Sequence, residues 1–264
     1  MTTSLLSPTR ATAATGTVAL RLDGVSKVYG RGPGAVHALD NVCLTVAPGE
    51  FLCLVGASGC GKSTLLSLVA GLDRTSAGTI TVSGGGAPAL MFQESALFPW
   101  LTVAANVALP LRLRGVGRAE RAERAAQLLR AVHLEDFGGK RPHELSGGMR
   151  QRVALARTLA MDTGLLLMDE PFGALDAMTR DLLHDELERI WQERNLTVVF
   201  VTHNVREAAR LGDRIVLLSS RPGRVAWEHR VDVPRPRRME SLEVAAVAAE
   251  VTERLRQEVR RHGA

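Results

Sequence analysis

FLCLV-GASGCGKST, residues 51–64, is the stretch that decides the fold. Its first five residues form a continuous apolar run, which is typical of a strand buried on both faces of a sheet. The remainder fits the pattern G-x-x-x-x-G-K-[S/T], and the apolar residues after it suit a buried helix. A strand, a glycine-rich loop and a helix in this order predict a phosphate-binding loop. Its residues are Gly56, Ala57, Ser58, Gly59, Cys60, Gly61, Lys62, Ser63 and Thr64.

Each part of this loop has a chemical reason. Glycines let backbone N–H groups turn inward around a phosphate, and the N-terminus of the following helix adds the positive end of its dipole. Lys62 can reach the terminal phosphates of a nucleotide, and the Ser63 hydroxyl can bind Mg²⁺. An ordinary glycine-rich turn is the alternative, but the strand before the loop and the helix after it favour phosphate binding.

Strands and helices alternate along the rest of the chain. Residues 18–28, 38–46 and 79–82 read as strands, and a helical block over residues 102–134 is broken near residues 115–117. After it, helices are expected at 148–161, 180–194 and 239–261 and strands at 165–168 and 197–202. We therefore expect an α/β fold built on a mostly parallel sheet with helices on both faces.

Composition divides the chain into three parts. Residues 1–17 are rich in Ser, Thr and Ala and have no apolar signal core, so we expect a flexible leader. Residues 18–238 form the main domain, in which residues 94–160 are expected as an inserted helical subdomain, and residues 239–264 form a C-terminal helix. No apolar stretch approaches the roughly 18 residues that span a bilayer, which predicts a soluble protein.

Charge and cysteine content indicate which partners and which cell compartment to expect. The net charge is +5, yet only three of the 33 basic residues are lysine and the arginines are scattered among acids. This pattern argues against nucleic acid as a partner. Cys43, Cys53 and Cys60 have no metal-ligand spacing, so reduced thiols in the cytosol are expected, with Cys53 buried in its apolar run.

Two carboxylates follow a second apolar run. Residues 165–168 predict a buried strand, and Asp169 and Glu170 stand at its end. Because the chain turns there, both acids can face the phosphate loop. Asp169 would then bind Mg²⁺ through water, and Glu170 would polarise an attacking water as general base. Acids after strands are common, so this interpretation depends on the phosphate loop upstream.

Residues 145–152, LSGGMRQR, contain a second glycine-rich helix start. A simple N-cap by Ser146 is one explanation, but a cap requires neither consecutive glycines nor the Arg-Gln-Arg that follows. Ser146 with the Gly147 and Gly148 amides makes an anion-binding helix start. Since the chain already has a phosphate loop, we expect this second site to serve the nucleotide held by another copy. The segment therefore predicts a dimer.

LSGGMRQR also closely resembles the signature sequence of ABC ATPases, and the resemblance extends over about residues 18–230. It implies a P-loop NTPase core with an antiparallel β subdomain, and hydrolysis of ATP with Mg²⁺ between two copies of the chain. By this resemblance Tyr29 stacks on adenine, and Gln93 contacts the metal site and transmits movement to a membrane partner. Asp176 belongs to a loop crossing the dimer interface, and His203 contacts the γ-phosphate and steadies Glu170.

A subgroup resemblance concerns the partners. Residues 95–102, 106–111 and 217–224 resemble the nitrate, sulfonate and taurine importers. This implies integral-membrane permease subunits, an extracytoplasmic solute-binding protein, and a place on the cytoplasmic face of the membrane. Phe98 and Trp100 would form an apolar socket for the permease, unless they belong to the core of the helical subdomain. A pyrimidine precursor remains an alternative cargo.

Two other classes of protein are alternatives to a transporter subunit. A soluble ABC ATPase without a transport role usually has two motif sets or a long coiled-coil insertion, and a small-molecule kinase would leave Ser146 without a purpose.

The chain departs from the family pattern at two places. The stretch between Lys62 and Gln93 is shorter than in the family, which leaves strand pairing in the antiparallel subdomain open. Asn204 stands where an acid commonly follows the histidine, with little consequence expected.

Overall fold

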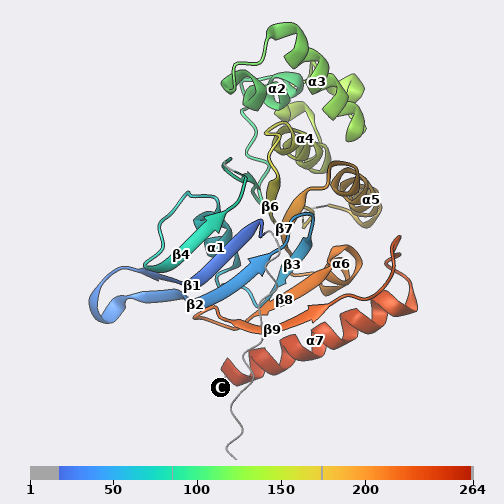
Figure 1. Ribbon diagram of the computed structural model, residues 1–264. Helices are drawn as coiled ribbons and strands as arrows, with labels where there is room; N and C mark the ends of the chain where they lie inside the picture. Colours follow the sequence, from blue (N-terminus) through green and yellow to red (C-terminus); the bar gives the residue numbers. More distant parts are fainter. Residues whose placement is uncertain (1–17, 85, 174, 263–264) are drawn as a thin grey trace, which may run out of the picture.

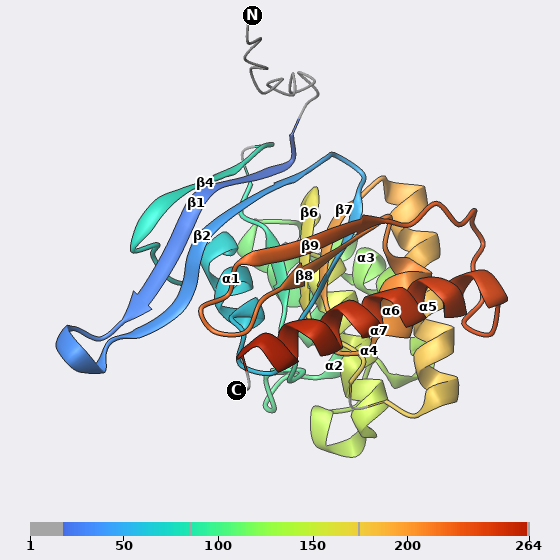
Figure 2. The same ribbon diagram turned by 90° about the horizontal axis from the view of Figure 1, so that it is seen from below.

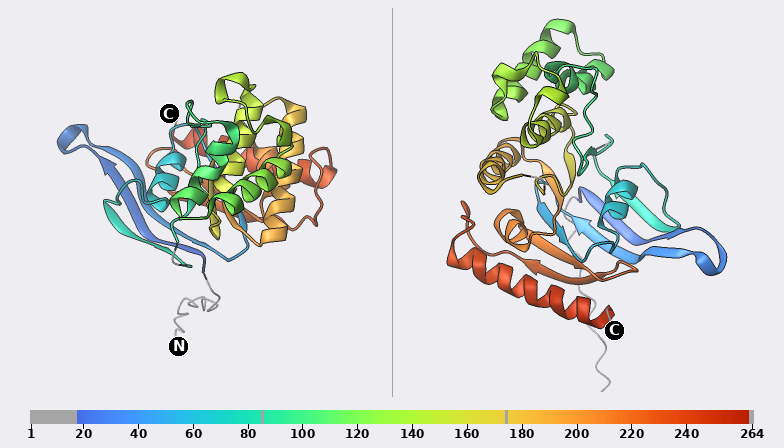
Figure 3. Two further views of the ribbon diagram at one scale, coloured as in Figure 1. Left: turned by 90° about the horizontal axis from the view of Figure 1, so that it is seen from above. Right: turned by 180° about the vertical axis from the view of Figure 1, so that it is seen from behind.

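A computed structural model describes residues 18–84, 86–173 and 175–262 of the chain (Figure 1). It contains a six-stranded sheet, a three-stranded sheet beside it, and a group of helices at one end, which Figure 3 shows from above and from behind. The arrangement confirms the predicted α/β class with a mostly parallel sheet, an antiparallel β subdomain and a separate helical part. The predicted leader, residues 1–17, lies outside the described residues.

The larger sheet has the strand order β5-β6-β7-β3-β8-β9. Its first five strands run parallel, and β9 pairs antiparallel with β8 at one edge. The strands are β3 Phe51–Val55, β5 Ala89–Met91, β6 Leu165–Asp169, β7 Thr197–Val201, β8 Arg214–Leu218 and β9 Val225–Arg230. All residues of β3 and β7 are buried, as expected for parallel strands covered on both faces.

Alternate residues of β3 supply two different cores. Phe51, Cys53 and Val55 belong to the cluster that includes apolar residues of α4 (Gly147–Leu159) and α5 (Ala177–Arg194). Leu52 and Leu54 belong to the cluster on the other face, with leucines of α1 (Lys62–Val69) and residues of the smaller sheet. Each fully buried leucine contributes roughly 1.5–3 kcal/mol, so both cores fix the strand from which the phosphate loop leaves.

The smaller sheet is antiparallel, in the order β2-β1-β4. Its strands are β1 Leu20–Tyr29, β2 Val36–Val46 and β4 Ala77–Val82. β4 pairs with β1 from Leu20↔Val82 onward, so the short stretch between Lys62 and Gln93 still completes this sheet. Glycine is required at position 78, where β4 comes close to β1. Gly78 has φ +80°, and a Cβ there would lie 2.3 Å from the Gly24 carbonyl oxygen.

The group of helices consists of α2 (Val103–Leu113), α3 (Arg118–Ala131) and α4, with short 3₁₀ turns at Glu135–Phe137 and Pro142–Glu144. The predicted break near residues 115–117 is confirmed, since α2 ends just before Gly115 with φ +78°. Thr102 caps α2 by accepting a hydrogen bond from Ala105 N at 3.2 Å. The buried Asn106 holds the preceding turn by accepting from Phe98 N and donating to Phe98 O.

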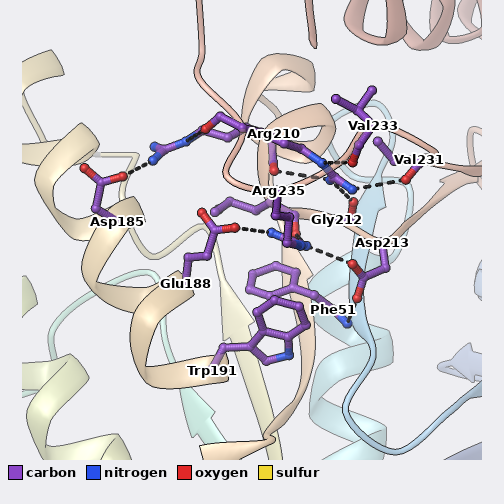
Figure 4. Close-up of polar contacts among 12 residues, drawn as sticks. Phe51, Asp185, Glu188, Trp191, Arg210, Gly212, Asp213, Val231, Val233 and Arg235 are labelled. Carbon is purple, nitrogen blue, oxygen red and sulfur yellow. Dashed lines mark hydrogen bonds and ion pairs between the residues drawn. The ribbon is translucent and has the colours of Figure 1, made fainter. Parts of the chain in front are cut away.

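The C-terminal part returns to the core. The expected C-terminal helix is present as α7 (Leu242–His262), which packs on α6 (Val205–Leu211) (Figure 2). The chain leading to α7 is fastened by Arg235, which donates to Glu188 Oε1 at 2.6 Å and Asp213 Oδ1 at 2.9 Å (Figure 4). Its guanidinium also lies 4.4 Å from the ring centroid of Trp191.

Four short elements were not predicted. β5 (three residues), α6 (seven) and β9 (six) show no clear apolar period, whereas β8 contains the apolar run 215–218 and could have been predicted in the same way as β6. Among the helices in the described part of the chain, none is both long and apolar enough to cross a membrane.

Candidate active site

The phosphate loop connects β3 to α1, as predicted. Gly61, at the N-cap position of α1, has φ +104°, and no side chain caps this helix start. A Cβ on Gly61 would lie 2.7 Å from Leu39 Cδ2 and 2.8 Å from the Ala38 carbonyl oxygen. Only glycine therefore fits, both for its backbone conformation and for the close approach of β2. The helix begins with its N–H groups without a side-chain acceptor from the cap, which suits an incoming anion.

Lys62 lies folded over its own loop. Its side-chain ammonium donates to the carbonyl oxygens of Gly56 at 2.9 Å and Ala57 at 3.0 Å, and the residue is 7% exposed. Ser58, Gly59 and Ser63 are exposed around it at the mouth of the loop. A buried cation bordered by exposed backbone is an arrangement that can bind phosphate through direct charge and N–H donors.

Asp169 at the end of β6 meets the loop through Ser63. The Ser63 hydroxyl donates to the Asp169 carboxylate. Burial raises the pKa of Asp169 above its ordinary value and the charge of Glu170 adds to the rise, while Ser63 and Lys62 oppose it. A carboxylate destabilised in this way gains from a bound cation, and hydroxyl and carboxylate oxygens are ligands that Mg²⁺ accepts. The pair therefore fits a magnesium ion.

No group of three or more His, Cys, Asp or Glu side chains gathers into a metal site within the described part of the chain. Mg²⁺ is compatible with this, because it retains water and is often held by one or two protein oxygens together with phosphate. A zinc or iron site built from such side chains would require a ligand cluster of that kind.

Glu170 and His203 meet at the ends of neighbouring strands. His203 Nδ1 lies 2.9 Å from Glu170 Oε2, and the two side chains are 64% and 22% exposed respectively. Glu170 has φ +45° and its N–H still donates to Val201 O at 3.0 Å, so the chain turns while the ladder between β6 and β7 continues. Such a backbone costs about 1–3 kcal/mol and is typical of functional sites. The pair can hold and orient a water molecule.

The signature segment lies at the start of α4. Ser146 caps the helix by accepting from Met149 N at 3.2 Å, and Gly147 and Gly148 form its first turn. A Cβ on Gly148 would lie 3.3 Å from Leu175 Cδ2, so this helix start packs against the beginning of α5. In Figure 1, α4 and α1 stand well apart, so this chain does not bring its two anion-binding helix starts together.

Asp176 begins α5. Its carboxylate accepts a hydrogen bond from Thr179 N at 2.9 Å, which holds the pKa of Asp176 below its ordinary value. The residue is a helix cap in this chain, and its exposure leaves it accessible to a second chain.

Gln93 lies between the core sheet and the helices. Its carbonyl oxygen accepts from Gln151 Nε2 of α4 at 2.6 Å, and the residue is exposed. Arg157 of α4 donates to Ser95 O at 2.9 Å and Ala96 O at 2.7 Å. The segment after Gln93 is thus held by the same helix that begins at the signature segment.

Tyr29 ends β1 on the smaller sheet and is 42% exposed. Its hydroxyl donates to Asp73 Oδ2 at 3.0 Å, and Lys27 Nζ lies 4.7 Å from the ring centroid. Lys27 also pairs with Asp73 at 2.7 Å, so the ring is fixed in place. Sequence reasoning did not single out Asp73 or Lys27, because neither belongs to a motif.

Phe98 and Trp100 lie on the surface. Trp100 is 68% exposed and Phe98 is 37% exposed, and their ring centroids are 5.3 Å apart. The alternative that they form the core of the helical part is therefore wrong for Trp100. Both rings are therefore accessible from solvent.

Comparison with known proteins agrees with this geometry. The family model described as ABC transporter matches residues 39–173. A taurine import ATP-binding protein of Burkholderia pseudomallei is 48% identical over 80% of this chain and 84% of that protein. A nitrate import ATP-binding protein of Synechocystis sp. is 45% identical over 81% of this chain and 83% of that protein. The dimeric structure of a bacterial ABC transporter cassette is 35% identical with a TM-score of 0.75, over 81% of this chain and 100% of that one.

Proposed function

This chain belongs to the ABC transporter family and is an ATP-hydrolysing cassette, and from that premise we propose that it energises an importer for a small anionic solute. Relatives named for taurine and nitrate import support this cargo class. An alkanesulfonate fits the same class, and a pyrimidine precursor is the alternative. The contact between Glu170 and His203 beside the phosphate loop is the observation that carries the catalytic part of the proposal.

ATP binding is assigned to the phosphate loop and Tyr29. The γ-phosphate would take the place of the Gly56 and Ala57 carbonyls as partner of the Lys62 ammonium, which is already directed into the loop. The exposed ring of Tyr29 offers a face for adenine, and its anchorage to Asp73 limits the entropy lost on stacking.

Ser63, Asp169 and Gln93 would hold Mg²⁺. The ion would neutralise charge on the phosphate oxygens during phosphoryl transfer. Ser63 already contacts the Asp169 carboxylate, and Asp169 has a raised pKa, so both residues are suited to share a cation. Gln93 joins this site to α4 through the hydrogen bond from Gln151.

Glu170 is assigned as the general base. His203 Nδ1 holds the Glu170 carboxylate from one side, which leaves the remaining lone pairs to accept a proton from water. The other ring nitrogen of His203 can then meet the γ-phosphate, which keeps both groups close to the reacting atoms.

Two copies of the chain would share each ATP. Ser146, Gly147 and Gly148 offer a second anion site, and Asp176 stands exposed beside it, while α1 lies well apart in the same chain. The dimeric cassette among the solved structures supports this assembly. The γ-phosphate would supply the difference in affinity that closes the dimer, and hydrolysis would reopen it.

The membrane partners are assigned to the helical part, residues 94–160 within a main domain over residues 18–238. The exposed Phe98 and Trp100 lie five and seven positions after Gln93, so a permease bound there could be moved by changes at the nucleotide. An extracytoplasmic solute-binding protein would select the cargo, and the chain would lie on the cytoplasmic face of the membrane.

The catalytic assignment is tested with Glu170→Gln. The variant should retain ATP, form a stable ATP-bound dimer and hydrolyse at least about a hundredfold more slowly, in the range for lost acid–base catalysis. Hydrolysis is measured as phosphate release and the dimer by size-exclusion chromatography. Hydrolysis at the parent rate would show that Glu170 is not the base.

The transport assignment is tested by affinity purification from membranes with the tagged full chain. We expect a permease to be recovered with the parent, and much less with Trp100→Ala, which should hydrolyse ATP normally in isolation. Recovery of ribosomes without a permease would instead favour a soluble ABC ATPase with no transport role.

A further inference from the structure

A buried polar cluster lies behind the Glu170–His203 pair. It consists of Arg180 and His184 on α5, Thr202 at the end of β7, and Glu207 on α6, and we call it the α5–α6 cluster. His184 is 0% exposed, Thr202 2% and Glu207 4%. Ionisable side chains are seldom buried to this extent without a reason, because removing them from water is costly.

Glu207 is the centre of the cluster. It accepts a hydrogen bond from Thr202 Oγ1 at 2.5 Å, and its other oxygen lies 3.2 Å from His184 Nε2 and 3.7 Å from Arg180 Nε. Burial alone would raise the pKa of Glu207, but the nearby His184 ring and the Thr202 hydroxyl outweigh burial, so this pKa lies below its ordinary value. Glu207 is therefore a buried carboxylate that is hydrogen-bonded to Thr202 and faces the nitrogen atoms of His184 and Arg180.

His184 is the least satisfied member. It is close to Glu207, yet neither ring nitrogen has a well-aligned hydrogen bond within the described residues, and Nδ1 lies 3.8 Å from the Asp181 carboxylate. The ring packs edge-on against Phe172, with centroids 5.3 Å apart. A glutamine or an apolar side chain would satisfy ordinary packing more easily, so a buried imidazole here calls for an explanation.

Both catalytic segments are tied to this cluster. The Thr202 hydroxyl donates to Glu207 and accepts from Asn204 N at 2.9 Å, so the residues on both sides of His203 are fixed. Arg180 donates to Phe172 O at 3.3 Å and Leu175 O at 2.7 Å, which fixes the loop after Glu170. Glu207 touches neither Glu170 nor His203, yet it contacts side chains that fix the segments next to both.

We propose that His184 and Arg180 are positioning residues that act through Glu207 to set the placement of His203 against Glu170. This inference rests on the catalytic roles proposed above and assigns a purpose to a buried histidine outside every motif. Loss of the imidazole removes the Nε2 contact 3.2 Å from Glu207, so the carboxylate moves, draws Thr202 with it and shifts His203. The chemical step slows, whereas ATP binding at Lys62 is unchanged.

The test compares His184→Leu with His184→Gln in the full chain. We expect His184→Leu to lower kcat roughly tenfold, within the range of coupling energies between residues in contact, with KM for ATP within about twofold of the parent value. His184→Gln retains an N–H donor and should recover most of kcat. His229→Leu is the matched control, because His229 also faces a carboxylate, Glu250 at 3.7 Å, far from the site, and its kcat should equal that of the parent.

Three further measurements separate effects on folding from effects on catalysis. Rates are taken well below the unfolding midpoint of each variant, and Thr202→Val against Thr202→Ser repeats the comparison without touching α5. In a His203→Ala background, His184→Leu should cause no further loss, because it acts through His203.

A parent-like kcat for both His184→Leu and Thr202→Val overturns the inference, as does a fall in His184→Gln equal to that in His184→Leu. Glu170→Gln distinguishes failure of the positioning inference from failure of the proposed general base. If that variant is inactive while His184→Leu is parent-like, only the positioning inference fails; if Glu170→Gln is active, the proposed base fails first.

Discussion

The starts of α1 and α4 differ in how they satisfy the unpaired N–H groups at a helix N-terminus. At α1, Gly61 is left-handed and no side chain caps the helix. At α4, Ser146 caps the helix itself, with its hydroxyl 3.2 Å from Met149 N. The first helix start is left open for a phosphate and has Lys62 beside it, whereas at the second one N–H group already has an acceptor within the chain.

This difference assigns ATP binding to the start of α1 and dimer formation to the start of α4. An open start with a buried lysine can bind ATP in one copy of the chain. A self-capped start gains less from an anion, so it adds to affinity only when a second copy brings a phosphate already held by its own loop. We therefore expect substitutions at α1 to abolish binding, and substitutions at α4 to spare binding and affect dimer formation and hydrolysis.

The largest expected effect follows from Gly61→Ala. The left-handed backbone and the 2.7 Å approach to Leu39 force the loop to move, and ATP affinity measured by calorimetry should fall at least about a hundredfold. Gly71→Ala is the matched control, because Gly71 has φ +73° with nothing within 4 Å of a Cβ. That control should lose about 1 kcal/mol of stability and bind ATP normally. Normal binding by Gly61→Ala would remove the distinction between the two helix starts.

Ser146→Asp should have the next largest effect. Aspartate caps a helix as well as serine does, so the unfolding temperature and ATP binding should match those of the parent. A negative charge facing the phosphate of the partner should nevertheless lower hydrolysis by about tenfold or more and prevent dimer formation in the Glu170→Gln background. If hydrolysis is unchanged, Ser146 is a helix cap and nothing else.

Gly147→Ala is expected to lower hydrolysis less than Ser146→Asp does, and it tests how closely the partner's nucleotide approaches the Gly147 backbone. A Cβ on Gly147 would meet only Arg150 Nη2, at 3.9 Å, so the chain itself does not require glycine there. Stability should stay equal or rise by up to about 1 kcal/mol, while hydrolysis falls severalfold if the nucleotide of the partner approaches this backbone. Unchanged hydrolysis would place the shared ATP elsewhere.

The smallest effect concerns pH. Burial raises the pKa of Asp169, so this carboxylate takes up a proton, and loses its attraction for Mg²⁺, at a higher pH than an ordinary aspartate does. The ionised form is the unfavourable one in the folded state, and lowering the pH relieves that cost. Mg²⁺-dependent hydrolysis should therefore fall early on the acid side, and Ser63→Ala should move this fall to higher pH in a pH–rate profile. An acid limb unmoved by Ser63→Ala would contradict the contact between the two residues.

Local patterns made the centre of the fold predictable. The apolar runs at β3, β6 and β7 each lead directly into residues of the site, so Lys62, Asp169 and His203 could be located from the order of strand and loop. Cys53 was expected to be buried and is 0% exposed. Packing of the smaller sheet could not be predicted, because it depends on the close approach of Gly78 to Gly24, residues far apart in sequence.

Tertiary contacts account for what the sequence did not reveal. His184 and Glu207 are 23 positions apart and belong to different helices, and neither stands in a motif or a period that would single it out. Trp100 was expected in an apolar socket for a partner, with the core of the helical part as the alternative, and its exposure agrees with the first expectation. Short elements such as α6 depend on tertiary packing for their existence.

The scarcity of lysine has a practical consequence for labelling. Lys62 is folded into its loop and Lys27 is paired with Asp73, so both amines are shielded. Lys140 has a side chain 55% exposed and stands in the connection before the signature segment. An amine-directed fluorophore should therefore attach at Lys140 among the side chains of the described residues. The native chain carries its own reporter position for motions of the helical part, without any engineered cysteine.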